Sequence, residues 1–293
     1  MNDINLTNTN QDIRKMKKKN RKLMSQKIGR IFFYLAIGVI LFVTCFPFIW
    51  MILASFKTSF QVMDPTQLFI FKPYYANYGV VFERYDFFKP ILNSLIIAVG
   101  STGLGLLIGL PASYSIARNR MHKFSLIILV VRFFPGIAFL LPWYIIFMKI
   151  GISDTHIALI LSHLLINLPF IVWVMIPYFE SLPRELDEAG KVDGCYTLQV
   201  FTRILLPLTG PGVITTSLLA IIFSWNNFVF SLVLAGGKTK TLSLALFSFI
   251  TYASIDWGAL MAAAVIITLP ILVLSLVTQR YIIQGLTAGA VKG

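Results

Sequence analysis

Charge is scarce in this sequence, and most of the charge that is present is positive. Only 13% of the 293 residues are charged, with 12 Asp and Glu against 25 Lys and Arg, while 57% are hydrophobic and the mean hydropathy is +0.79. A typical soluble domain has about 25% charged residues, and the interior of a chain this long cannot bury so much apolar surface. The composition therefore excludes an ordinary cytosolic enzyme and a disordered chain, and it requires lipid to cover part of the surface.

Sulfur and imidazole ligands are also few. The two cysteines, Cys45 and Cys195, fall in an apolar run and in a charged loop, so we expect neither a disulfide nor a metal site from them. Of the three histidines, no two stand at metal-ligand spacing on one helix, and the H-E-x-x-H pattern of metalloproteases is absent. We predict no metal ligands and no catalytic residues, which argues against a membrane-embedded enzyme.

Six apolar stretches fill most of the chain, each near the ~20 residues that cross a bilayer as a helix. They lie at about 31–55, 91–117, 124–148, 157–178, 211–234 and 258–280. Residues 1–30 form a basic arm that we expect to be flexible, and residues 281–293 form a tail. We therefore predict an all-α, polytopic membrane protein with about six transmembrane helices in a permease domain at 31–280, its first helix uncleaved.

Lysine and arginine are distributed unevenly among the segments that join these stretches. With the N-terminus in the cytoplasm, the cytoplasmic segments hold 17 of them and the outer segments hold 7. The positive-inside rule then predicts that both termini are cytoplasmic, in agreement with an even number of spans. Nine of the 17 lie in the arm beside a hydrophobic run, so we expect the arm to contact anionic membrane lipid and not nucleic acid.

The predicted spans have features of a packed and bent bundle. A small residue at every fourth position of the second stretch favours close helix packing. These residues are Ser101, Gly105, Gly109, Ser113 and Ala117. Prolines are expected to break or bend the helices where neighbouring groups satisfy the freed backbone. They are Pro47, Pro111, Pro135, Pro142, Pro169 and Pro270. Such a bundle suits a pathway across the membrane better than a simple anchor.

The predicted cytoplasmic loop 179–210 holds five of the twelve acidic residues. Pro183 with three acids in the next five residues is typical of a helix N-terminus. Asp193-Gly194 favours a turn, and a second short helix then extends to Pro207. We predict two short helices around a glycine turn, although a solvated connector fits these features equally well.

The same loop carries a longer residue pattern. Glu188-Ala189-Gly190 is followed by three residues, Gly194, nine residues and then Ile204-Leu-Leu-Pro207. This resembles the Glu-Ala-Ala loop of the inner-membrane subunits of ABC importers, with every spacing met. Gly190 departs from the family, which usually has alanine there, and a glycine in mid-helix should loosen the helix by about 1 kcal/mol.

The resemblance extends over nearly the whole chain after residue 30 and is to carbohydrate permeases of the maltose-permease type. It is carried by Asn93-Ser94, Arg132-Phe-Phe-Pro135, Trp225-Asn226-Asn227-Phe228 and the tail at 285–293. Asn227 departs from the family, where an acidic residue is frequent. The resemblance implies the type I ABC importer permease fold and a multi-pass subunit in the cytoplasmic membrane of a bacterium or archaeon. It also implies import of a sugar or oligosaccharide into the cytoplasm.

Partners and contact residues follow from the same resemblance. We expect a second, homologous permease subunit in a heterodimer, two copies of a cytoplasmic ABC ATPase and an extracytoplasmic solute-binding protein. Gly237-Lys238-Thr239 lacks the first glycine of a P-loop, so we expect no cofactor in this chain, and ATP and Mg²⁺ on the partner ATPase. In the family, the loop docks into the ATPase. The residues assigned here to that contact are Glu188, Ala189, Gly190, Asp193, Gly194, Ile204, Leu206 and Pro207.

A sugar pathway requires amides, hydroxyls and aromatic faces, and the fourth and fifth stretches supply them. The candidates are His163, Asn167 and Phe170 on one helix face, followed by Trp225, Asn226, Asn227 and Phe230. Interhelical hydrogen bonding is the alternative for the polar members, and we favour it. Arg132 stands inside the third stretch, where it either pairs across the bundle or lines the pathway; we expect pairing.

Two other transporter classes remain open. An ion-coupled secondary transporter would place acidic groups inside its spans, whereas all twelve Asp and Glu fall outside the predicted ones. An ABC permease for another small polar solute would share the loop pattern, since only the tail and the Trp-Asn stretch indicate a carbohydrate.

Overall fold

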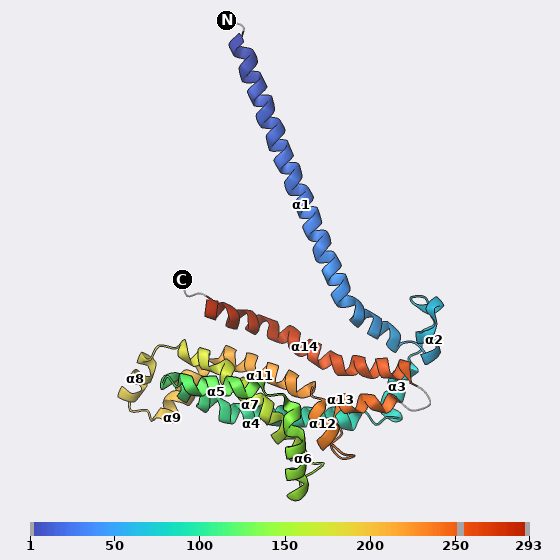
Figure 1. Ribbon diagram of the computed structural model, residues 1–293, viewed down its shortest axis with the longest axis vertical. Coiled ribbons are helices and arrows are strands. Elements are labelled where there is room, and N and C mark those ends of the chain that lie inside the picture. The colour runs from blue at the N-terminus through green and yellow to red at the C-terminus, as the bar shows by residue number, and fades with distance from the viewer. Residues whose placement is uncertain (1–2, 251–254, 291–293) are drawn as a thin grey trace. The chain divides into compact units, whose positions relative to one another are not determined.

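The computed structural model describes residues 3–250 and 255–290, and it describes side chains for residues 27, 29–250 and 255–279. The chain separates into two units, Met1–Leu53 and Ala54–Gly293 (Figure 1). The first unit is nearly all of α1 (Asp3–Ser55), a single helix that continues from the basic arm into the first apolar stretch. Many apolar side chains of this helix are exposed, among them Phe32 (73% exposed) and Ile40 (64% exposed). A helix with this surface needs lipid around it.

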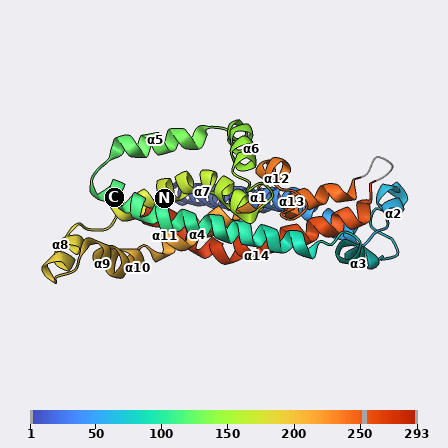
Figure 2. The same ribbon diagram turned by 90° about the horizontal axis from the view of Figure 1, so that it is seen from below.

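The second unit is built around four long helices. They are α4 (Phe88–Arg118), α7 (His156–Glu180), α11 (Gly210–Trp225) and α14 (Trp257–Ala290), and they lie side by side in Figure 2. Helix α4 packs along α7, and α11 contacts α4, α7 and α14. The cores between them are apolar and include Ile171 and Met175, neither of which is exposed.

The predicted small-residue face of α4 is confirmed as the packing surface against α7. All five of its residues are buried. A Cβ at Gly105 would lie 2.6 Å from Cδ1 of Ile171, and one at Gly109 would lie 2.9 Å from Cγ2 of the same side chain. The two helices approach this closely because α4 has almost no side chain along that face.

Two predicted spans are interrupted. Helix α5 (His122–Phe133) ends before Pro135, and the helical residues Gly136–Lys149 that follow it, η2 (Gly136–Phe139) and α6 (Leu140–Lys149), are turned by 86°. Pro135 explains this break because it lacks an N–H and holds the preceding residue in an extended conformation. The other five prolines predicted to break or bend helices lie within helices. The predicted fifth span, 211–234, is not a single helix, because α11 stops at Trp225 and α12 (Val229–Leu234) begins only after three non-helical residues.

Counting spans by length and composition gives four to six. Among the described residues, four helices qualify alone: Gly29–Ser55, Phe88–Arg118, His156–Glu180 and Trp257–Gln279. Two bent pairs bring the number to six if each pair is one span. One pair is His122–Phe133 with Gly136–Lys149, and the other is Thr197–Leu208 with Gly210–Trp225, bent by 80°.

Short elements lie at opposite ends of the second unit (Figures 1 and 2). At one end are α8 (Glu185–Val192), α9 (Thr197–Gln199), η3 (Val200–Leu205) and α10 (Leu206–Leu208). At the other end are α2 (Ser59–Met63), η1 (Pro65–Gln67) and α3 (Ala76–Glu83). After α12 the chain forms α13 (Leu242–Ala245) and η4 (Leu246–Phe249), and an isolated bridge joins Ile250 to Ile255.

A carboxylate holds the loop that follows α12. Asp154, in the left-handed region with φ of 54°, accepts hydrogen bonds from the backbone N–H of Gly236, Lys238 and Thr239 at 2.8, 3.2 and 3.1 Å. The Thr239 hydroxyl donates a fourth at 2.7 Å. Burial acts to raise the pKa of Asp154, but these hydrogen bonds outweigh it and leave the pKa below its ordinary value. Gly237-Lys238-Thr239 thus belongs to a structural loop.

Candidate functional site

The loop 179–210 folds as two short helical segments around a glycine turn, as predicted. Helix α8 ends at Val192, and Gly194 follows with φ of +83°, in the left-handed region that favours glycine. The second segment comprises α9, η3 and α10, and η3 is π-helical. Hydrogen bonds from Gly194 N to Lys191 O (3.0 Å) and from Cys195 N to Gly190 O (2.9 Å) satisfy carbonyls at the end of α8.

Close packing explains the glycine at position 190. Gly190 is buried within α8, and a Cβ there would lie 2.9 Å from both Cγ2 of Val200 and Cδ1 of Ile204. Helix α8 therefore rests directly on η3, and an alanine would require those side chains to move. The close packing on η3 offsets the loosening expected from a glycine in mid-helix, and α8 remains helical through Gly190.

The residues assigned to the ATPase contact do not all face outward. Glu188, Ala189, Asp193, Gly194 and Pro207 are exposed, Ile204 and Leu206 are half-buried, and Gly190 is buried. Three apolar side chains that the sequence pattern missed stand beside the exposed group: Val192 is 87%, Tyr196 80% and Leu198 70% exposed. We call Glu188, Ala189, Val192, Asp193, Gly194, Tyr196 and Leu198 the coupling surface. Apolar side chains this open, at the tip of a charged loop, are typical of a protein-binding site.

An ion pair joins this loop to the end of α4. Arg118 Nη2 lies 2.9 Å from Asp187 Oδ2, with each side chain 13% exposed. The Tyr114 hydroxyl donates to Asp187 Oδ1 at 2.6 Å, and Arg118 Nη1 donates to Leu182 O at 2.9 Å. In addition, Arg184 Nη2 donates a hydrogen bond to Arg118 O at 3.0 Å. The sequence analysis identified Asp187 only as an acidic residue at a helix N-terminus, so it missed the ion pair with Arg118.

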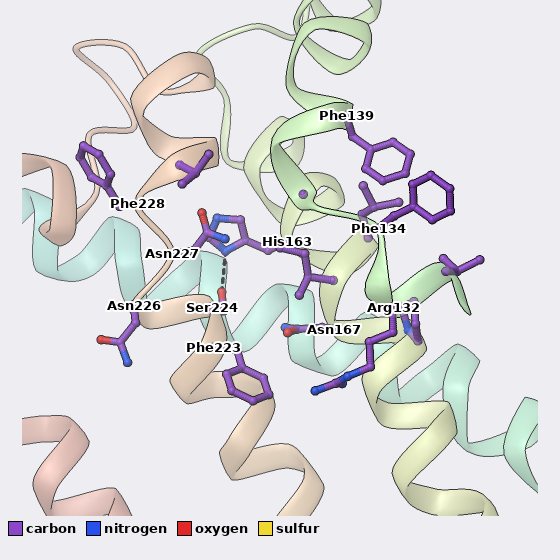
Figure 3. A pocket seen from close by; sticks show the side chains of 16 residues that line it. Arg132, Phe134, Phe139, His163, Asn167, Phe223, Ser224, Asn226, Asn227 and Phe228 are labelled. Carbon is purple, nitrogen blue, oxygen red and sulfur yellow. Dashed lines mark hydrogen bonds between the residues drawn. The ribbon is translucent and has the colours of Figure 1, made fainter. Parts of the chain in front are cut away.

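A cavity of about 500 Å³ lies where the two broken spans meet α7 (Figure 3). Arg132 reaches it from α5, His163 and Asn167 from α7, and Asn226 from the end of α11. Four of the seven predicted pathway residues line it: His163, Asn167, Asn226 and Asn227. Phe134, Phe139, Phe223 and Phe228 line it as well and were missed. Amides, an imidazole, a guanidinium and aromatic rings therefore share one cavity.

Interhelical hydrogen bonds connect the polar groups behind the cavity. Asn167 Nδ2 on α7 donates to Ser101 Oγ on α4 at 3.2 Å, and Ser101 Oγ donates to Ser224 Oγ on α11 at 3.2 Å. Ser224 Oγ is 2.6 Å from His163 Nδ1. The favoured interpretation, interhelical hydrogen bonding, therefore agrees with the contacts of Asn167 and His163. Asn227 Oδ1 accepts from Phe230 N at 3.1 Å, a role that needs no charge, at the start of α12.

The other three predicted pathway residues are packed away from the cavity lining. Trp225 is 6% exposed and donates from Nε1 to Ile267 O on α14 at 3.3 Å. Phe230 is 1% exposed, with its ring 6.3 Å from that of His163. Phe170 is 5% exposed and lies beneath Arg132. The sequence places these aromatic side chains on helices beside the cavity, but helical spacing cannot show which of the rings are buried by a neighbouring helix.

The expected pairing of Arg132 is wrong. Its guanidinium carbon lies 4.6 Å from the centre of the Phe170 ring and 6.0 Å from that of Trp173. The ion pair described for the side chains of residues 29–250 and 255–279 is Arg118–Asp187, and it does not include Arg132. Arg132 is exposed and lines the cavity instead. In the same part of the chain, no cluster of three His, Cys, Asp or Glu residues could hold a metal ion.

Comparison with known proteins agrees with this architecture. A probable ABC transporter permease of Sinorhizobium fredii, y4oR, is 36% identical over 256 residues, covering 87% of this chain and 92% of the relative. The trehalose/maltose transport system permease protein MalG of Thermococcus litoralis is 36% identical over 273 residues, covering 88% and 96%. Among solved structures, a bacterial ABC transporter involved in import of the acidic polysaccharide alginate has a TM-score of 0.75 at 20% identity, covering 88% of this chain and 97% of that one.

A protein-family model also matches well over half of the chain. Residues 101–288 fit the family of binding-protein-dependent transport system inner membrane components. This range contains the loop 179–210 (the coupling loop), the residues that line the cavity, and most of α4 and of α14 with every helix between them. The chain therefore belongs to that family, as a multi-pass permease component of an ABC importer.

Proposed function

We propose that this chain is the permease subunit through which a sugar or oligosaccharide enters the cytoplasm, driven by ATP hydrolysis on a partner. The observation that carries this proposal is the course of α4. Arg118 at one end of α4 is tied to the coupling loop, and Ser101, 17 residues earlier, belongs to the hydrogen-bond chain behind the cavity. At 1.5 Å per residue these points are about 25 Å apart along one continuous helix, so displacement of the loop would reach the cavity.

The sugar assignment is supported by the cavity and by the relatives. Amides and an imidazole match the hydroxyls of a saccharide, and the rings of Phe223 and Phe228 offer faces for its apolar side. Two interrupted helices flank the cavity, which is the arrangement that membrane transporters use to bring backbone polar groups to a solute. The relative from Thermococcus litoralis is a trehalose/maltose permease component.

The partners and orientation complete the proposal. Both termini and the coupling loop lie in the cytoplasm of a bacterium or archaeon, and the opposite end of the bundle receives a solute-binding protein. A homologous permease subunit forms a heterodimer with this chain, and the pair sits on two ATPase copies that bind ATP and Mg²⁺. The chain itself carries no cofactor. The excess of 17 over 7 basic residues on the assigned cytoplasmic side supports this orientation.

Co-purification of the ATPase with the membrane complex tests the coupling surface. Val192→Glu and Tyr196→Glu each place a charge at an open apolar position, and they should lower the amount of bound ATPase at least fivefold. Asn119→Glu is the matched control, since Asn119 is exposed at the end of α4 and lies outside the coupling surface. Equal ATPase recovery in all three variants would remove the coupling surface from the proposal.

Uptake by Asn226→Ala tests the cavity as the sugar path. Asn226 is exposed, and no described side-chain hydrogen bond holds its amide, so its loss should leave the fold intact. We expect uptake to fall several-fold or the preference among sugars to change. Unchanged uptake with unchanged preference would place the sugar elsewhere.

A further inference from the structure

A pair of stacked phenylalanine rings joins the cavity to a second hollow. The rings of Phe228 and Phe247 have centres 5.0 Å apart and planes at 19° to each other. Phe228 lines the cavity, whereas Phe247 lines the second hollow, which has a volume of about 420 Å³. In Figure 3, Phe228 and Arg132 stand on opposite sides of His163. Because two nearly parallel rings cover only the faces that they turn to each other, the pair forms a partition between the two spaces.

We call the second space the outer hollow, since the predicted topology places the chain between the fifth and sixth spans outside the membrane. Its walls come from the loop after α12, from α13 and from η4, and they include Gly237, Lys240, Leu244, Phe247 and Ser248. The volume lies in the range of about 300–1,000 Å³ that is usual for small-molecule sites. Phe247 is 55% exposed, so its ring is accessible to a solute.

Hydrogen bonds fix the walls of the outer hollow to the start of α4. Asn93 Nδ2 donates to Lys240 O at 3.0 Å, and Ser94 Oγ accepts from Leu242 N at 2.8 Å. Asp154 holds the same loop at its other end through the hydrogen bonds described above. A hollow held in this way is preformed, so a solute that binds there pays little for ordering its walls.

The side chains of the outer hollow suit a saccharide. The ring of Phe247 can pack against the apolar face of a pyranose. Lys240 Nζ donates to Ser248 Oγ, which uses one of the three donors of the ammonium group and leaves donors for sugar hydroxyls. An inorganic anion would leave the ring unused, and an apolar solute would cover the ammonium group without pairing it. The cavity, with its amides and rings, offers the same combination on the other side of the ring pair.

We infer that the outer hollow is the entry subsite for the saccharide, which passes from Phe247 to Phe228 and into the cavity when the two rings separate. This inference rests on the proposed function and adds the route of entry to it. Phe247 contacts the sugar and has no part in docking the binding protein.

The test is uptake by the complete transporter, reconstituted in proteoliposomes with its sister permease, ATPase and binding protein. The probes are radiolabelled trehalose, maltose and maltotriose. The variants are Phe247→Leu, which keeps an apolar side chain but removes the ring, and Phe247→Tyr, which keeps the ring. Phe82→Leu is the matched control, because Phe82 is 43% exposed on α3 and lies outside both linings.

Two quantities are measured for each protein. The first is the amount of sugar imported per ATP hydrolysed, and the second is the concentration of binding protein that half-maximally stimulates ATP hydrolysis. Phe247→Leu should lower the import per ATP at least fivefold. Phe247→Tyr should retain at least half of the wild-type value, and Phe82→Leu should match wild type. The half-maximal concentration of binding protein should be the same in all four proteins.

Three results would overturn the entry subsite while leaving the proposed sugar import intact. The first is unchanged import per ATP in Phe247→Leu. The second is failure of Phe247→Leu to assemble while Phe247→Tyr assembles, which would make the ring structural. The third is a higher half-maximal concentration of binding protein in Phe247→Leu with normal import per ATP, which would make the outer hollow a protein-docking surface. Import of none of the three probes by wild type would overturn both the entry subsite and the proposed function.

Discussion

Arg118 and Asp187 form an ion pair at 2.9 Å that fastens the coupling loop to the cytoplasmic end of α4, as oriented by the proposed topology. The pair is reinforced by Tyr114, which donates to the second carboxylate oxygen of Asp187 at 2.6 Å. An ion pair that is mostly buried and has additional hydrogen bonds resists separation more than a solvent-exposed pair does. The loop and α4 are therefore expected to move together when a partner pushes on the coupling surface.

Breaking this pair should uncouple ATP hydrolysis from transport. Asp187→Asn leaves Arg118 largely buried without its counter-charge, a change that costs about 3–5 kcal/mol when an ion pair is buried. We expect sugar uptake per ATP hydrolysed to fall at least fivefold in reconstituted transporter. Glu185→Gln is the control, since Glu185 is an exposed acid on the same helix. Wild-type coupling in Asp187→Asn would mean that the ion pair does not transmit motion.

The glycine turn should be sensitive to backbone strain alone. Gly194 has φ of +83° and no atom within 4 Å of where a Cβ would stand. Gly194→Ala therefore adds no clash and costs only the left-handed conformation, about 1–2 kcal/mol. We expect weaker ATPase binding in co-purification. Gly210→Ala, at a glycine with equally open space and no positive φ, should bind ATPase as wild type does. If both variants bind equally well, the turn geometry is not needed for the contact.

A larger side chain should destabilise the α4–α7 contact only on the face of α4 that packs against α7. Gly105→Leu would drive a side chain into Ile171, whereas Gly103→Leu points into open space. Overpacking of this kind costs about 1–3 kcal/mol. In thermal unfolding of the purified complex, we expect Gly105→Leu to lower the midpoint by several degrees and Gly103→Leu to leave it unchanged. Equal midpoints for the two variants would contradict the close approach.

The Asp154 loop should lose stability in acid. The pKa of Asp154 in the folded protein lies below the ordinary 3.8, so the charged form is the one that folding favours. Its contribution is fully present above pH 3.8, the value expected for the unfolded chain, and is lost as the pH falls through the lower folded pKa. Asparagine also has an acceptor oxygen and also tolerates φ of 54°. Asp154→Asn therefore tests the contribution of the negative charge alone.

We therefore expect Asp154→Asn to unfold at a lower temperature than wild type at pH 7, with the difference shrinking once the pH falls below 3.8. Asp86→Asn is the control. Asp86 also has a positive φ, of 45°, and none of the side-chain hydrogen bonds described for Asp154. A difference that grows as the pH falls would contradict the assignment.

Local patterns in the sequence predicted much of this structure. Apolar stretch length located the four helices that could each cross a membrane alone. The small residues from Ser101 to Ala117 located the α4–α7 contact, and Gly194 located the turn. These features depend on neighbours within a few residues of one another. The break after Trp225 has no proline or glycine to signal it. At this break Phe230 N, in the first turn of α12, donates a hydrogen bond to Asn227 Oδ1, a contact that becomes visible only in the folded chain.

Long-range pairings were beyond the reach of sequence patterns. Arg118 and Asp187 are separated by the whole of α5, α6 and α7, and each alone fits an ordinary role at a helix end. Arg132 was recognised as a charge within a span, but whether a carboxylate or a ring lies beside it depends on how α5 packs against α7. The three missed apolar residues of the coupling surface stand out only by exposure.

ATP-driven uptake is the measurement that tests the central claim most directly. Proteoliposomes would contain this chain with its sister permease and ATPase, ATP on the ATPase side, binding protein and labelled oligosaccharide on the other side, and no ion gradient. We predict accumulation of the sugar that requires both ATP and the binding protein. Accumulation driven by a proton or sodium gradient without ATP would contradict the account and would identify an ion-coupled transporter instead.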